Sequence, residues 1–163
     1  MSYKGGSETG QSNVTASAVI SFAEKLEAES SGFYRKLAQR FEGNHKETFL
    51  FFVNESEKNR KLITRTYQET ISDALEACFS FEGINLNDYR VQTALRDETN
   101  VSEALNIAIE LEEKAGKFYL DVAERSRSLL ATMPRAFGKV AEKRNSRKIK
   151  LRSLLESGST RSC

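Results

Sequence analysis

The sequence is poor in the residues that build disulfides, metal clusters and nucleophilic active sites. Its 163 residues include one histidine, one proline, two cysteines and no tryptophan. Cys78 and Cys163 share no metal-ligand spacing and indicate no disulfide framework. No nucleophile–base–acid arrangement or phosphate-binding loop is visible, so any acid–base catalysis would depend on carboxylates or tyrosines.

Long apolar runs and a strong excess of one charge are also absent. No apolar run approaches the ~20 residues that span a bilayer. The first residues, Met1 to Gln11, are polar and rich in glycine and serine, and they lack the apolar core of a signal peptide. The net charge of +2 indicates neither a nucleic acid nor a membrane surface as the partner. We therefore expect a cytoplasmic protein with no membrane partner.

The chain is instead rich in helix-forming residues and has the length of one domain. Glutamate, lysine, arginine, alanine and leucine are abundant, and helix breakers are few. A chain of 163 residues can form one compact domain with a core of its own. The polar ends predict flexible tails at residues 1–14 and 157–163 around a single domain at 15–156.

An internal repeat organises this domain. Six residues of the first half recur 85 positions later: Ala23, Leu26, Glu27, Phe33, Tyr34 and Ala38 become Ala108, Leu111, Glu112, Phe118, Tyr119 and Ala123. The candidate N-caps Thr15 and Asn100 have the same offset, and Glu103 completes a capping box with Asn100. Repeat and caps together predict helices near residues 15–42, 44–77, 100–128 and 132–156.

The connections between these helices predict the topology. Asn44, directly after Gly43, is expected to cap the second helix, with Glu47 completing another capping box. Only short turns separate the first helix from the second and the third from the fourth, so each pair is antiparallel. The segment from Cys78 to Thr99 lacks periodicity and is long enough to return along the bundle. We predict an all-α, ferritin-like four-helix bundle, in which a long crossover joins two antiparallel helical hairpins.

Each predicted helix has polar residues inside its apolar stripe. Glu27 in the first helix and Glu112 in the third are flanked by apolar residues one turn away on each side. The second and fourth helices have polar pairs three residues apart, at an offset of 88: Ser56 with Asn59, and Arg144 with Arg147. A buried carboxylate is costly unless it is paired or bound to a cation. The alternative is that each helix is rotated, so that its glutamate sits at the boundary of the core and reaches solvent. The recurrence of the glutamate in both halves favours burial.

The pattern resembles rubrerythrin-type proteins of the ferritin-like superfamily. In that family a metal-binding glutamate precedes a Phe-Tyr tyrosine by seven residues on helices one and three. Glu27 before Tyr34 and Glu112 before Tyr119 match this pattern. The family's second and fourth helices each supply a Glu-x-x-His pair. Counted from the aromatic residues Phe49 and Phe137, those positions hold Ser56, Asn59, Arg144 and Arg147 in this sequence.

The resemblance implies two iron or manganese ions, but the substitutions predict their loss. Such a centre needs about four carboxylates and two imidazoles, and only Glu27 and Glu112 remain. Arg144 and Arg147 place fixed positive charges opposite them and can bind carboxylates through paired hydrogen bonds. We therefore predict no catalytic residue and no cofactor. The polar layer is expected to be an arginine–glutamate network that also contains Ser56, Asn59, Tyr34 and Tyr119.

A metal-binding alternative stays open at this point. His45 is expected to be exposed in the first turn of the second helix. Four acids lie about a quarter turn off the stripe and would approach the core only if the helices were rotated: Glu55, Glu57, Glu113 and Glu142. If they rebuilt a site, the chain would be a rubrerythrin-like di-iron oxidoreductase of the peroxidase type, or an iron-handling protein. Otherwise it is a non-catalytic structural or interaction protein.

Two further segments bear on partners. Residues Phe49 to Phe52 put apolar side chains on more than one face of the second helix, so either the crossover or a partner subunit must cover one of them. We expect a homodimer or a subunit of a larger assembly. Arg135 to Arg152 contains eight basic residues and a single acid. Because Arg144 and Arg147 are expected to face the core and the rest to solvate an exposed helix, this segment does not predict nucleic-acid binding.

Overall fold

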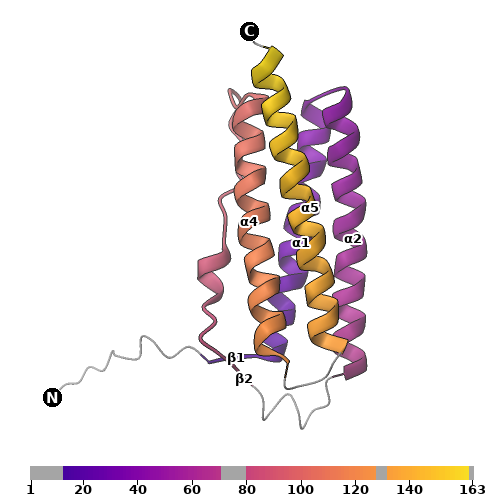
Figure 1. The fold of residues 1–163 in the computed structure, drawn as a ribbon, viewed down its shortest axis with the longest axis vertical. Helices are drawn as coiled ribbons and strands as arrows, with labels where there is room; N and C mark the ends of the chain where they lie inside the picture. The colour runs from indigo at the N-terminus through magenta and orange to yellow at the C-terminus, as the bar shows by residue number, and fades with distance from the viewer. Residues whose placement is uncertain (1–12, 71–79, 128–131, 162–163) are drawn as a thin grey trace, which may run out of the picture.

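Four long helices lie side by side along one common direction (Figure 1). This computed structural model describes residues 13–70, 80–127 and 132–161. The helices are α1 (Ala16–Arg40), α2 (Asn44–Thr70), α4 (Val101–Arg125) and α5 (Thr132–Arg161). α1 and α5 run in one direction and α2 and α4 in the other, so each hairpin is antiparallel (Figure 1). The predicted all-α bundle with two helical hairpins is confirmed.

Two helices begin as their caps predict. The side chain of Thr15 accepts a hydrogen bond from the backbone N–H of Ala18 at 3.1 Å. The side chain of Asn100 accepts from the Glu103 N–H at 2.8 Å, and the Glu103 carboxylate accepts from the Asn100 N–H at 2.9 Å. This reciprocal pair is the predicted capping box, and it satisfies two backbone donors that have no partner inside the helix.

The start of α2 differs from the prediction. Asn44 is the first residue of the helix rather than its cap. The carbonyl oxygen of Gly43 accepts hydrogen bonds from the N–H groups of Lys46 and Glu47, at 3.0 and 3.3 Å. Gly43 has a φ of 76°, a conformation that glycine adopts without steric cost. The turn between α1 and α2 therefore depends on Gly43.

Parts of both predicted tails have regular secondary structure. Asn13–Thr15 forms a short strand, β1, that pairs antiparallel with β2 (Ser80–Glu82), with Val14 opposite the buried Phe81. Three residues are too few for an alternating pattern to show, and the pairing joins distant segments. α5 continues past its predicted end at Glu156 because no proline follows, and one helical glycine, Gly158, costs only about 1 kcal/mol. The remainder of the predicted tails, and the predicted α2 extension beyond Thr70, lie outside the described residues.

The crossover returns along the bundle beside α4, as predicted (Figure 1). It contains β2 and a short 3-10 helix, η2 (Leu86–Tyr89), which the sequence did not indicate. The hydroxyl group of Tyr89 donates a hydrogen bond to Asp121 on α4 at 2.6 Å. The side chain of Arg125 donates to the carbonyl oxygen of Glu82 at 2.9 Å. These contacts hold the described part of the crossover against α4.

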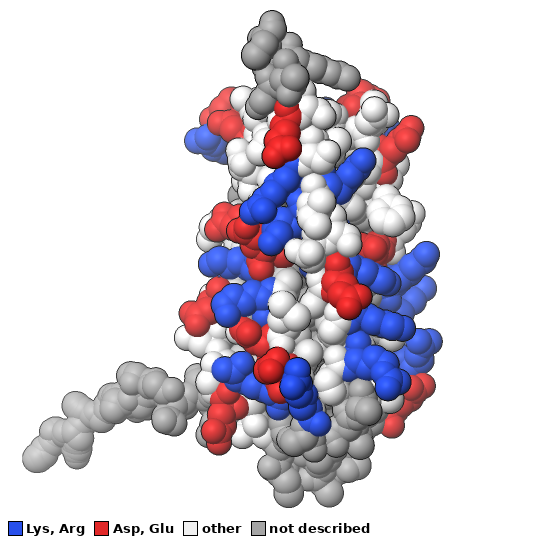
Figure 2. Space-filling view, viewed as in Figure 1, with Lys and Arg blue, Asp and Glu red and all other residues white. Residues whose placement is uncertain are grey.

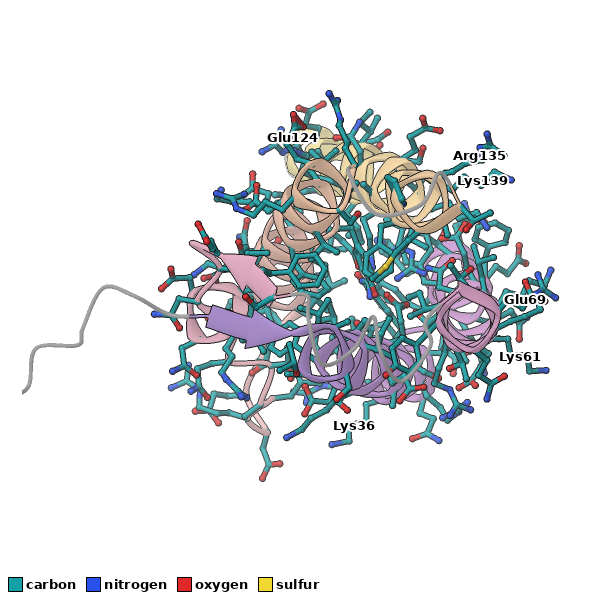
Figure 3. The ribbon with its side chains drawn as sticks, turned by 90° about the horizontal axis from the view of Figure 1, so that it is seen from below. Lys36, Lys61, Glu69, Glu124, Arg135 and Lys139 are labelled. Atoms are coloured by element: carbon teal, nitrogen blue, oxygen red, sulfur yellow. The ribbon has the colours of Figure 1, made fainter. Side chains whose placement is uncertain are left out.

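The core lies along the axis between the four helices. Seen from below, side chains fill the space between the helices, whereas the labelled charged residues extend outward (Figure 3): Lys36, Lys61, Glu69, Glu124, Arg135 and Lys139. Aromatic rings pack within this core, with the Phe22 and Phe118 centroids 4.8 Å apart, the Tyr119 and Phe137 centroids 5.6 Å apart, and the Tyr34 and Phe52 centroids 5.1 Å apart. No helix in the described part of the chain is long and apolar enough to cross a membrane. The polar layer therefore lies within an aromatic and aliphatic core.

Candidate functional site

Two glutamates and two arginines meet in the interior of the bundle. The exposed fraction is 1% for Glu27, 1% for Glu112, 0% for Arg144 and 1% for Arg147. Each lies on the core-facing stripe of its helix, because apolar neighbours one turn away turn that face inward. The alternative that the glutamates reach solvent is excluded by their burial. All four charges are therefore held in a low-dielectric interior, where each needs a partner.

Arg144 lies between the two glutamates and binds both. Its Nη1 donates hydrogen bonds to both carboxylate oxygens of Glu112, at 2.9 and 3.0 Å. Its Nη2 donates to Glu27 at 2.8 Å and to the hydroxyl oxygen of Ser30 at 2.9 Å. The Ser30 hydroxyl donates in turn to the carbonyl oxygen of Leu26 at 2.7 Å. One guanidinium thus links α1, α4 and α5.

The two tyrosines of the repeat form reciprocal hydrogen bonds. Tyr34 on α1 donates to Glu112 on α4, and Tyr119 on α4 donates to Glu27 on α1, each at 2.5 Å. Burial raises the pKa of both phenols well above the ordinary value, and the carboxylate next to each raises it further. Both tyrosines therefore stay protonated donors, and each one connects the two hairpins.

Arg147 extends the layer towards α2. Its Nε donates to Glu55 at 2.7 Å and its Nη1 approaches Glu112 at 3.5 Å. The guanidinium carbon lies 5.3 Å from the Phe52 ring centre and 5.9 Å from that of Tyr34. A planar cation over aromatic faces gains further electrostatic stabilisation.

Glu55 is the member of the layer to which the sequence assigned no definite role. It is one of the four acids predicted to lie off the stripe, and it is partly buried in the structure. The one feature of the sequence that could have indicated this role is the position of Glu55, directly before Ser56 on the edge of α2 that faces α5. The side chain of Arg147 is long enough to reach that edge, which a stripe of Cβ positions does not reveal.

The positive charge of Arg144 is stabilised by the neighbouring glutamates. Burial alone would lower the pKa of Arg144, but Glu112 and Glu27 outweigh burial and raise it well above the ordinary value. Arg144 is therefore a cation in the folded protein. Its positive charge faces the two carboxylates at hydrogen-bond distance, so this part of the layer is a charge-assisted network.

The two neutral positions on α2 contribute less to the network. Ser56 and Asn59 are fully buried. The amide nitrogen of Asn59 donates to Glu27 at 3.3 Å. Within the described residues, the Ser56 hydroxyl oxygen and the Asn59 amide oxygen have no hydrogen-bond partner. Their main effect is steric, because side chains shorter than glutamate and histidine leave space for the arginines from α5.

The other acids stay outside the layer. Glu57 is half-buried and pairs with Arg60 on the same helix at 3.3 Å. Glu113 pairs with Arg152 across the surface at 2.7 Å. Glu142 is exposed. None of these three carboxylates turns inward, so the helix rotation that would have rebuilt a metal site from them does not occur.

The predicted exposure of His45 is wrong. It is half-buried, and its ring centre lies 6.4 Å from that of Phe49, one turn further along α2. The i, i+4 spacing puts the imidazole over the aromatic ring and covers part of its surface. His45 is nevertheless in the first turn of α2, where its ring contacts Phe49 rather than a residue of the polar layer.

A pair of divalent cations does not fit this set of donors. Both oxygens of Glu112 and one oxygen of Glu27 bind Arg144, whose guanidinium lies between the two carboxylates. A metal ion there would meet the positive charges of Arg144 and Arg147 at close range. Across residues 13–70, 80–127 and 132–161, no three histidine, cysteine, aspartate or glutamate side chains form a metal-binding group.

The fold is similar to that of a known protein. A crystal structure from Thermotoga maritima, described as a candidate ferritin-like diiron-carboxylate protein, superposes with a TM-score of 0.72. The match covers 90% of this chain and 97% of that chain, with 19% sequence identity. No protein-family model matches the sequence, and no curated protein matches it. The chain therefore has a ferritin-like fold, while the identity is too low to carry over any chemistry.

Proposed function

We propose that this protein is a non-catalytic, rubrerythrin-type bundle with a structural or interaction role, in which an arginine–glutamate layer takes the place of a di-metal centre. The observation that carries the proposal is the position of Arg144. Its guanidinium binds Glu27 and Glu112 together, and the same two residues match the metal-binding glutamates of the family pattern. The proposal assigns stability, rather than redox chemistry, to the polar layer.

The charges of the layer support this role. A di-metal centre neutralises buried carboxylates and ties helices together, and Arg144 does both for Glu27 and Glu112. Arginine keeps its charge at all physiological pH values and needs no supply of metal. Arginine also has no accessible change of oxidation state. Replacing the metal ions by arginine therefore keeps the helices bound to one another but removes the capacity for electron transfer.

The tyrosines support the absence of acid–base catalysis. Tyr34 and Tyr119 are fully buried, each donates a hydrogen bond to a glutamate, and burial raises the pKa of each phenol well above its ordinary value. A general acid or base needs a pKa near the working pH and contact with a substrate. Neither condition is met inside this layer.

Elemental analysis of protein made in iron- and manganese-replete medium tests the proposal. We expect far less than one metal ion per chain and no near-ultraviolet band of an oxidised di-iron centre. A variant that restores the family's ligands at all four substituted positions is the matched control: Ser56→Glu, Asn59→His, Arg144→Glu and Arg147→His. Near-stoichiometric metal in the natural protein would overturn the proposal. Metal in the restored variant alone would support it.

A metal-binding, rubrerythrin-like oxidoreductase or iron-handling protein is the second candidate. The structural neighbour from Thermotoga maritima favours it, because its description names a diiron-carboxylate protein and its fold matches over most of both chains. This function requires ligands other than the arginine-bound glutamates. It predicts both bound metal and the near-ultraviolet band, so the same analysis decides between the two candidates.

We propose further that the protein works as a homodimer or as a subunit of a larger assembly. Large apolar side chains are exposed on three helices: Leu50 and Phe51 on α2, Leu120 on α4 and Ile149 on α5. The described part of the crossover packs on α4, through Tyr89 and Glu82. Light scattering after size-exclusion chromatography should give a mass above that of one chain. A monomeric mass at all concentrations would contradict this proposal.

A further inference from the structure

A groove between α2 and α5 has the size of a small-molecule site. Its volume is about 330 Å³, within the range of roughly 300–1,000 Å³ typical of ligand pockets. Phe51 and Phe52 line the α2 side, with ring centres 6.1 Å apart in an edge-to-face arrangement. The ring of Phe51 is 62% exposed. An aromatic wall that remains exposed to water is suited to an apolar ligand body.

The α5 side of the groove is cationic. Lys143, Arg147 and Lys150 line it, and spacings of four and three residues put them on one face of the helix. Neither lysine forms an ion pair with any residue that the structure describes, whereas Lys46 and Lys117 do. Figure 2 views this side of the molecule, where basic side chains lie beside uncharged surface over α5 and α2.

Arg147 connects the groove to the buried layer. It lines the groove although only 1% of its surface is exposed, and its Nη2 has no hydrogen-bond partner within the described residues. Hydroxyl groups of Thr48 and Ser146 are also part of the lining. An anion in the groove would therefore meet two unpaired lysines and polar groups that can donate hydrogen bonds.

The acids of the groove leave a positive excess near Lys143 and Lys150. Glu55 is neutralised by Arg147 at 2.7 Å. Glu47 is eight residues earlier on α2, about 12 Å along the helix axis at 1.5 Å per residue. Because α2 and α5 run in opposite directions (Figure 1), Glu47 lies towards the Lys150 end of the groove and is farther from Lys143. An anionic group is favoured near the lysines and an apolar group along the phenylalanines.

We propose that this groove binds a small amphiphilic carboxylate. Its aromatic or aliphatic body lies against Phe51 and Phe52, and its carboxylate is held by Lys143 and Lys150. The proposal is independent of the function assigned to the buried layer, since it requires neither the presence nor the absence of metal. A ligand in this groove would contact Arg147, which is also part of the buried layer between the two hairpins.

A second groove provides the control site. It lies between α1 and the crossover, has a volume of about 620 Å³, and has Lys25, Glu29 and Lys36 in its lining. Its charged residues are Lys25, Lys36 and Arg90 with a single acid, Glu29, and the Arg90 side chain donates a hydrogen bond to Asn87 at 3.0 Å. The aromatic residues of its lining are buried or half-buried, unlike the exposed Phe51, so Lys36→Gln tests whether the ligand binds in this groove instead.

Calorimetric titration of the full chain with three matched probes tests the proposal. The probes share one phenylbutyl body: phenylbutyrate, phenylbutanol and phenylbutylamine. We expect saturable binding of one phenylbutyrate per chain, at least about tenfold weaker binding of the alcohol, and weaker binding still of the amine. Equal binding of the carboxylate and the alcohol would overturn the assignment of the lysines.

Variants locate the site. In Lys143→Gln/Lys150→Gln the affinity for phenylbutyrate should fall to that for phenylbutanol, while the affinity for the alcohol stays unchanged. Phe51→Ser should weaken both probes. The controls are Lys148→Gln, on α5 but outside the groove lining, and Lys36→Gln in the second groove; both should bind like the natural protein. Loss of binding in either control would place the ligand elsewhere and overturn the proposal.

The test has one more outcome, in which a second copy of the chain occupies the groove. If a second chain fills the groove, phenylbutyrate affinity falls as protein concentration and the light-scattering mass rise together, and the proposal is wrong. If a ligand fills it, affinity is independent of protein concentration. Unchanged helical circular dichroism in each variant ensures that the comparison is made on folded protein.

Discussion

The two helical hairpins bring opposite charges to the same layer. The α1–α2 hairpin contributes Glu27 and Glu55 and no cation. The α4–α5 hairpin contributes Arg144 and Arg147 with one acid, Glu112. Neither hairpin is balanced on its own, and Arg144 and Arg147 each bind a glutamate of the other hairpin. This unequal distribution of charge indicates that the layer stabilises the packing of one hairpin on the other, rather than either hairpin alone.

The asymmetry lies in the second helix of each hairpin. α1 and α4 retain the same glutamate and tyrosine, and their side chains cross to form equal bonds of 2.5 Å. α2 and α5 differ at the corresponding positions, because α2 has the neutral Ser56 where α5 has the cation Arg144. In the α1–α4 pair the hydrogen bonds are symmetric, each from a neutral tyrosine to a charged glutamate. In the α2–α5 pair the positive charges come from α5, while α2 supplies Glu55 and the Asn59 amide. Substitutions can test each part of this comparison separately.

Removal of the central cation should have the largest effect. Arg144→Leu leaves Glu27 and Glu112 buried without their partner, which costs about 3–5 kcal/mol of unfolding free energy. Arg152→Leu is the matched control, because Arg152 pairs with Glu113 at 2.7 Å on the surface, with side chains 52% and 46% exposed. That loss should stay within about 1 kcal/mol. Equal losses in chemical denaturation would contradict the role given to burial.

Removal of the most heavily bonded acid should be next. Glu112 accepts hydrogen bonds from Tyr34, Arg144 and Arg147. Glu112→Ala should lower the unfolding free energy by about 3 kcal/mol, because it leaves buried positive charge in excess. Glu113→Ala, one residue further and exposed, should change it by less than about 1 kcal/mol. An unchanged melting temperature for Glu112→Ala would show that this carboxylate is not buried.

The symmetric part of the layer predicts two equal losses. Tyr34→Phe and Tyr119→Phe each remove one hydroxyl that donates to a buried carboxylate, so each should cost about 1.5–3 kcal/mol. Because the two hydrogen bonds are reciprocal, the values should agree to within about 1 kcal/mol. Chemical denaturation of the two variants side by side measures both. A loss in only one of them would break the equivalence of α1 and α4.

The same tyrosines predict a dependence on alkaline pH. Folding raises the pKa of Tyr34 and Tyr119, first through burial and then through the neighbouring glutamate. Their contribution to stability is therefore complete below the unfolded-state pKa of about 10 and falls as pH rises above it. Phenolate absorbance should show that these two of the five tyrosines ionise only when the chain unfolds. Ionisation of all five in the folded protein would contradict this.

The smallest effect is expected at Ser56. Its buried hydroxyl oxygen has no hydrogen-bond partner within the described residues. Ser56→Ala removes a polar group that gains nothing from the layer, so stability should stay within about 0.5 kcal/mol or rise slightly. Asn59→Ala also removes a bond to Glu27 and should cost more. A large loss at Ser56 would mean that α2 contributes more to the layer than its contacts indicate.

The sequence predicts the bundle and most of the layer because both follow local rules. The repeat and the caps at Thr15 and Asn100 mark helices by short-range pattern, and glutamates inside apolar stripes indicate buried charge. Long-range contacts have no such signal. The β1–β2 pairing joins distant segments, and Glu55 enters the layer only because the side chain of Arg147 extends to the edge of α2. These features depend on side-chain reach and on pairing between distant parts of the chain.

The most direct test of the central claim is the free energy of unfolding with a chelator and with increasing manganese(II) or iron(II). If Arg144 supplies the positive charge that compensates Glu27 and Glu112, the value should be the same in all conditions, within about 0.3 kcal/mol. A native metal site would add RT ln(1 + [metal]/Kd), or about 2.7 kcal/mol at a hundredfold excess over Kd. A stability that rises by about 1.4 kcal/mol for each tenfold increase in metal would contradict the claim.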